Sequence, residues 1–161
     1  MQCKTLTDIS DAFNWTPAPT SLDSLFFRCS SLKYIDISKW DCTNVTNCAS
    51  TFNTCYSLEK IVLPQFGENV TTCGSMFYEC GCLTDCNIEN LTLSNKCAKF
   101  NSMFYHCYNI EVLDLSHWDV SGGDTFANMF DTCHQLKALD LTNWEISDVC
   151  TTLASMFYVC R

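Results

Sequence analysis

The chain has 161 residues, of which 47% are hydrophobic and 17% charged, a composition typical of a folded domain. Eighteen acidic and nine basic residues give a formal charge of −9, which disfavours binding to nucleic acids and to anionic membranes. No apolar run reaches the roughly 18 residues of a membrane-spanning helix, and the start MQCKTLTDIS lacks the pattern of a signal peptide. We therefore expect one domain over residues 1–161, without nucleic-acid binding or membrane insertion.

A repeat of about 26 residues runs along the whole chain. Its clearest element is the motif Phe-x-x-Cys, seen in FFRC, FNTC, FYEC, FYHC, FDTC and FYVC. The cysteines that mark the phase of the repeat are Cys3, Cys29, Cys55, Cys80, Cys107, Cys133 and Cys160, at steps of 26, 26, 25, 27, 26 and 27 residues. A fixed period of this length indicates a protein built from stacked structural repeats.

Each repeat has the same order of expected elements. After Cys107, for example, Ile110, Leu113 and Leu115 follow an L-x-x-L-x-L rhythm, whose end predicts a short strand with one buried face. An aromatic or apolar corner follows, here Trp118, which we expect to be buried with its indole N–H bonded to the backbone. Apolar residues three apart then predict a short helical or 3₁₀ turn.

One such unit cannot bury its own apolar face, whereas a stack of units can. We therefore expect an α/β solenoid, a right-handed, leucine-rich-repeat-like array of about six 26-residue units of strand, corner and short helix. Its parallel sheet would lie on one face.

Several segments resemble a known repeat family. MFYHCYNIEVLDLSHWDVS and MFDTCHQLKALDLTNWEIS are similar to BspA-like leucine-rich repeats, which read roughly M-F-x-x-C-x-x-L-x-x-L-D-L-S-x-W-D-x-S-N-V-T. IVLPQFGENVTT and CNIENLTLSNKC fit this pattern least well. The resemblance implies a non-enzymatic, adhesion-type binding protein at a cell or particle surface, with a protein or host-matrix ligand. It supplies no catalytic residue, cofactor or metal ligand.

Fourteen cysteines raise the question of a disulfide scaffold. Twelve of them lie in repeat columns that are inward-facing or carry Leu, Val, Ile or Phe in other repeats, which favours packing as small apolar side chains. Disulfides stay an alternative, because neighbouring repeats would bring column mates about 5 Å apart. Zinc binding by CGCLTDC with Cys97, and catalysis by a cysteine beside His106 or His134, are weaker alternatives. Cys42 and Cys82 fall outside these columns and are candidates for exposed thiols.

The outward positions of the strands form the candidate binding face. Its residues are Tyr34, Asp36, Lys60, Asp85, Asn87, Glu89, Asp114, Ser116, Asp140 and Thr142. One interpretation is an acidic face for a basic partner or a divalent cation. The interpretation that we prefer for the aspartates of this column is a local hydrogen bond to the adjacent turn.

Two functions are consistent with these patterns. The first is a repeat module for protein–protein or adhesive binding through the strand face. The alternative is a structural subunit of a filament, capsid or surface lattice, because both ends of the chain fall at the same phase of the repeat without a polar cap. The location stays open, since a core of reduced thiols suits a reducing compartment and the resemblance suggests a surface.

Overall fold

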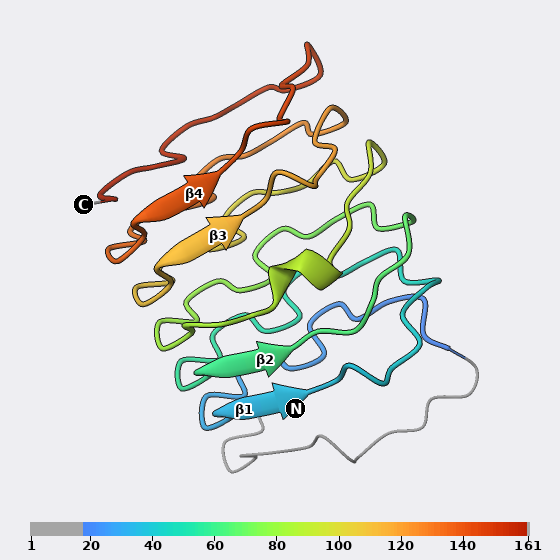
Figure 1. Ribbon diagram of the computed structural model, residues 1–161, viewed down its shortest axis with the longest axis vertical. Helices are drawn as coiled ribbons and strands as arrows, with labels where there is room; N and C mark the ends of the chain where they lie inside the picture. The colour runs from blue at the N-terminus through green and yellow to red at the C-terminus, as the bar shows by residue number, and fades with distance from the viewer. Residues whose placement is uncertain (1–17, 161) are drawn as a thin grey trace.

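The computed structural model describes residues 18–160, so Cys3 and the rest of the first repeat up to residue 17 lie outside the described residues. Its regular elements are β1 (Tyr34–Asp36), β2 (Lys60–Val62), the 3₁₀ turn η1 (Ile88–Asn90), β3 (Val112–Asp114) and β4 (Ala138–Asp140). Most of the remaining described chain forms turns and bends. Successive repeats lie side by side in the order of the sequence, and the strands share one side of the molecule (Figure 1).

The strands pair in parallel with the register that the repeat predicts. Ile35 lies opposite Ile61 in the pair β1–β2, and Leu113 lies opposite Leu139 in the pair β3–β4. Each strand is only three residues long, and the four strands form two separate two-stranded sheets. The expected strand positions are therefore confirmed in four repeats, whereas the expected single sheet is interrupted at η1.

A second ladder joins the repeats on the segments that precede the Phe-x-x-Cys motifs. It consists of single parallel bridges between Ser21 and Asn47, Asn47 and Thr72, Thr72 and Lys99, Lys99 and Thr125, and Thr125 and Thr152. Each bridge links one repeat to the next, so the described repeats are connected in this ladder without a break.

The prediction of a short helix before each motif is wrong for residues 18–160. These segments and the motifs that follow them instead form consecutive turns, as in Met103, whose N–H donates to the carbonyl of Phe100, and Cys107, whose N–H donates to the carbonyl of Phe104. The alternate N–H groups donate to the next repeat, for example from His106 to the carbonyl of Asp131. A helix would use these donors within its own segment, whereas here half of them hold neighbouring repeats together.

This turn geometry places non-glycine residues in the left-handed region at regular positions. Ser102 has φ 54° and His106 has φ 57°, and each is the third residue of a turn. The corresponding pairs in the other repeats are Ser24 and Arg28, Ser50 and Thr54, Ser75 and Glu79, Asn128 and Thr132, and Ser155 and Val159. Such backbone strain persists only where surrounding contacts impose it, and here the inter-repeat hydrogen bonds do so.

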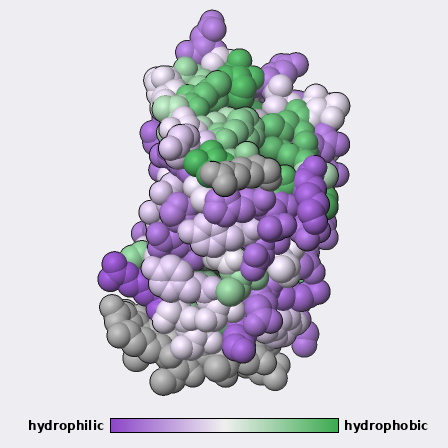
Figure 2. Space-filling model, turned by 90° about the vertical axis from the view of Figure 1, so that its left-hand side faces the viewer, coloured by the Kyte–Doolittle hydropathy of each residue, from purple (hydrophilic) through white to green (hydrophobic). Residues whose placement is uncertain are grey.

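The core is a column of phenylalanine rings contributed by the motifs. The ring of Phe104 stacks between those of Phe77, at 5.4 Å, and Phe130, at 5.7 Å, and all three are fully buried. Trp118 is buried, and its indole N–H donates to the carbonyl of Leu91 at 2.6 Å, which confirms the expected corner. In the last described repeat the same core positions reach the surface, and Figure 2 shows apolar side chains gathered at that end of the molecule.

Candidate binding site on the strand face

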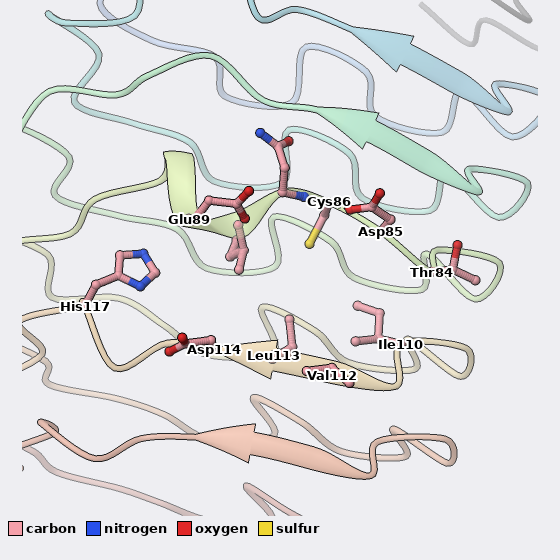
Figure 3. A pocket seen from close by; sticks show the side chains of 11 residues that line it. Thr84, Asp85, Cys86, Glu89, Ile110, Val112, Leu113, Asp114 and His117 are labelled. Atoms are coloured by element: carbon pink, nitrogen blue, oxygen red, sulfur yellow. Dashed lines mark hydrogen bonds between the residues drawn. The ribbon is translucent and has the colours of Figure 1, made fainter.

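A cavity of about 420 Å³ opens on the strand face where the two sheets are separated. Asp85, Cys86 and Glu89 lie on the segment around η1, and Leu113 and Asp114 lie opposite them on β3 (Figure 3). Its other lining residues are Thr84, Asn87, Ile88, Ile110, Val112 and His117. The cavity therefore combines carboxylates at its rim with the apolar side chains of the core beneath them.

The cavity exists because the strand ladder stops at Asn87. This residue has φ 30° and ψ 54°, in the left-handed region that asparagine tolerates better than most residues. Its side-chain oxygen accepts a hydrogen bond of 2.6 Å from the N–H of Leu63, a donor that a continuing strand would bind with its backbone. The chain then turns through η1 instead of pairing with β3, and a hollow is left between the two.

The carboxylates of the cavity are held in different ways. Asp85 pairs with Lys60 at 2.8 Å, and this contact holds the pKa of Asp85 below its usual value. The hydroxyl of Ser116 bonds Asp114 and, with its backbone N–H, lowers the pKa of that carboxyl. Glu89 is exposed at the rim. Lys60 offsets one of these three carboxylates, so the cavity favours a cationic group.

The thiol of Cys86 belongs to the floor of this cavity. The side chain is buried, and burial raises the pKa of its thiol to about 12. The thiol is therefore protonated at neutral pH, which makes it a poor nucleophile and a poor metal ligand. Its contribution to the cavity is that of a small apolar group.

The candidate binding face extends beyond this cavity. Asp36, Asp114 and Asp140 each accept a hydrogen bond from the backbone N–H two residues on, at Ser38, Ser116 and Thr142. The preferred interpretation of these aspartates as local caps is thereby confirmed. Of the candidate face, Asp85, Asn87, Glu89 and Asp114 line the cavity, and the residues outside its lining are Tyr34, Asp36, Lys60, Ser116, Asp140 and Thr142.

The cysteines of the motif column pack inward and also donate hydrogen bonds. The thiol of Cys107 lies 3.1 Å from the carbonyl oxygen of Phe77, one repeat back. The same bond joins Cys55 to Phe26, Cys80 to Phe52, Cys133 to Phe104 and Cys160 to Phe130. All cysteines of residues 18–160 are free thiols, and most are buried, as the packing interpretation predicts.

The two candidates for exposed thiols differ. Cys82 is exposed, as predicted. Cys42 is fully buried, so its predicted exposure is wrong. Cys42 comes two residues after the corner Trp40 and forms a parallel bridge with Phe66 of the next repeat. Its side chain faces the core at this bridge. Burial raises the pKa of the Cys42 thiol to about 12.

Sequence reasoning missed part of the site. His117 carries no repeat signal, and the spacing of Ile110 and Leu113 predicts the core positions that both occupy but not that they also line a cavity. The departure of CNIENLTLSNKC from the repeat was visible in the sequence. The hollow that follows from it depends on the left-handed backbone at Asn87, which the spacing of apolar residues does not reveal.

Comparison with known proteins places the chain in a family. The family described as Mycoplasma protein of unknown function, DUF285, matches residues 3–111 and 75–161. The chain therefore belongs to this family. No curated protein matches the chain.

Proposed function

We propose that the protein is a non-enzymatic binding module that engages a protein partner through its strand face. The observation that supports this most is the acid-rimmed cavity between the two sheets, which lies among exposed strand residues. A lysine or arginine of the partner would place its charge among Asp85, Glu89 and Asp114 and its aliphatic stem against the apolar floor. The net charge of −9 would also accelerate association with a basic partner.

This proposal is tested with a fluorescein-labelled peptide of alternating arginine and glycine, followed by fluorescence anisotropy at low salt. We expect Glu89→Gln to weaken binding about five- to tenfold, because it removes a rim charge without altering the fold. Glu68→Gln, an exposed acid outside the cavity, is the matched control and should have little effect. Equal weakening by both variants would show that net charge alone binds the peptide, and the cavity would lose its role.

We also propose that the repeats form one right-handed solenoid of the leucine-rich-repeat kind, related to BspA-like repeats. The support is the inter-repeat ladder, whose partners stay about one repeat apart from Ser21 to Thr152. A crystal structure in which the repeats wind with the opposite hand, or pack as separate units, would contradict this.

A surface location is part of the same proposal and rests on the resemblance. Within residues 18–160, no helix is both long and apolar enough to cross a membrane. Treatment of intact producing cells with an impermeant amine-reactive biotin reagent tests the location. Labelling of this protein, but not of a cytosolic marker, is the expected result.

A second function, self-assembly, is favoured by a separate observation at the last described repeat. Leu153 and Phe157 are each 48% exposed, whereas the equivalent Phe126 and Phe130 of the preceding repeat are fully buried. A second copy that covers this apolar end, seen in Figure 2, would bury the same positions.

The two functions are separated by light scattering over a range of protein concentrations. If the apolar end is an interface, the mass of the wild type measured by light scattering should rise with protein concentration. The mass of Leu153→Glu should stay that of a monomer. Val112→Glu is the control, because Val112 is 64% exposed on the strand face and is not part of the apolar end formed by Leu153 and Phe157. A wild type that is monomeric at all concentrations excludes the assembly function.

A further inference from the structure

The edge of the molecule that carries the Phe-x-x-Cys turns gathers aromatic side chains. The two central residues of each motif, and the residue after its cysteine, lie outside the phenylalanine column. The aromatic residues at these places are Phe27, Tyr56, Tyr78, Tyr105, His106, Tyr108, His134 and Tyr158, here called the aromatic edge. Neighbouring rings stack, as in Tyr78 and Tyr105 at 4.7 Å and Tyr108 and His134 at 5.3 Å.

The turn geometry fixes these side chains in place. Glu79 has φ 56°, and its N–H donates to the carbonyl of Tyr105 in the next repeat, so this edge is bonded from repeat to repeat. Gly81 leaves room for the ring of Tyr108, because a Cβ at this position would lie 2.9 Å from that ring. The edge is thus a built surface of rigid rings, separate from the strand face.

One end of the aromatic edge contains a cavity of about 520 Å³. Tyr56 is 52% exposed on its wall, and its hydroxyl donates to a carboxylate oxygen of Glu79 at 3.0 Å. The guanidinium of Arg28 lies over the ring of Phe27, 4.9 Å from its centre. Ser30, Asn53, Thr54 and Tyr78 complete the lining. Rings, amide, hydroxyls and both signs of charge therefore face the same space.

The mixed lining selects the class of ligand. Arg28 disfavours a cation and Glu79 disfavours an anion, while the many polar groups disfavour a purely apolar molecule. A neutral sugar ring satisfies all three conditions, because its C–H face packs on an aromatic ring and its hydroxyls both donate and accept hydrogen bonds. The volume is in the range of small-molecule sites. We propose that this cavity binds a neutral hexopyranose unit of a glycan, with the ring of Tyr56 as its stacking surface.

The roles follow from the geometry. Arg28 supplies donors and Glu79 an acceptor for the sugar hydroxyls, and Asn53 supplies both. The bond between Tyr56 and Glu79 holds the ring in place before the ligand arrives, which lowers the entropy cost of binding. This site does not depend on the strand face, so the two proposals succeed or fail independently.

The test uses saturation-transfer NMR with the methyl glycosides of glucose, galactose, mannose and N-acetylglucosamine, followed by titration of the sugar that responds. We expect at least one of the four to receive saturation. Tyr56→Ala should weaken its binding about tenfold, since the stacking surface is lost. Tyr56→Phe keeps the ring and removes the bond to Glu79, so it should lie between the wild type and Tyr56→Ala.

Tyr34→Ala is the matched control, because Tyr34 is also an exposed tyrosine but lies on the strand face. It should bind the sugar like the wild type. The unfolding midpoint of each variant is measured alongside, so that a folding defect is recognised. The proposal is overturned if none of the four glycosides receives saturation, or if Tyr34→Ala and Tyr56→Ala weaken binding equally.

Discussion

The phenylalanine column offers a direct test of how the repeats stabilise one another. Phe104 and Phe157 occupy the same place in the same motif, yet Phe104 is fully buried between two stacked rings and Phe157 is 48% exposed with one stacked ring, that of Phe130. Truncation of a buried phenylalanine to alanine costs about 3–5 kcal/mol of unfolding free energy. We expect Phe104→Ala to cost about this much.

Phe157→Ala should cost roughly half as much, about 1.5–2.5 kcal/mol, because about half of its side chain is already in water. The measurement is urea unfolding followed by tryptophan fluorescence, with Trp118 as a buried reporter in the core. Phe104→Leu is included because it keeps most of the volume and should fold even if Phe104→Ala does not. Equal costs for Phe104→Ala and Phe157→Ala would refute the argument that inter-repeat stacking and burial set the stability.

Three further predictions concern thiols, the tryptophan corner and acid stability. In native protein at about pH 8, Cys82→Ser should remove one rapidly formed maleimide adduct, whereas Cys42→Ser should remove none, because Cys42 is buried with its pKa raised to about 12. Trp118→Phe should cost about 1–3 kcal/mol in urea unfolding, since the carbonyl of Leu91 loses its donor, and a cost near zero would contradict the assigned bond. The pKa of Asp114 is lowered in the folded state by the hydroxyl and N–H of Ser116, so its contribution to stability is present at neutral pH. That contribution is lost as the pH falls below about 4, and Asp114→Asn should flatten this part of the pH profile of the unfolding midpoint.

The repeat made the strand positions predictable. Burial of Leu113 and the bond of Trp118 follow from a pattern in which the same residue type returns at the same phase. The local role of Asp114 was also predictable, because aspartate commonly bonds a backbone N–H two residues on. These features depend on one repeat and its immediate neighbours.

The turns were not predictable from spacing. Apolar residues three apart suit a helix and also suit the consecutive turns that are observed, and the difference lies in where alternate N–H groups donate. Only the next repeat supplies the acceptor for the N–H of His106, and the spacing of apolar residues within one repeat does not reveal this partner.

The sequence by itself determined the period, the buried columns and the packing role of most cysteines, because each of these is a local preference repeated many times. The tertiary structure alone decided which residues meet where the chain leaves the strand pattern. The break at Asn87 brings Glu89 and Asp114 to one cavity, and the stacked turns bring Tyr56 to Glu79. Both meetings depend on local backbone geometry, namely the left-handed conformation of Asn87 and the inter-repeat hydrogen bonds of the Phe-x-x-Cys turns, which side-chain spacing does not encode.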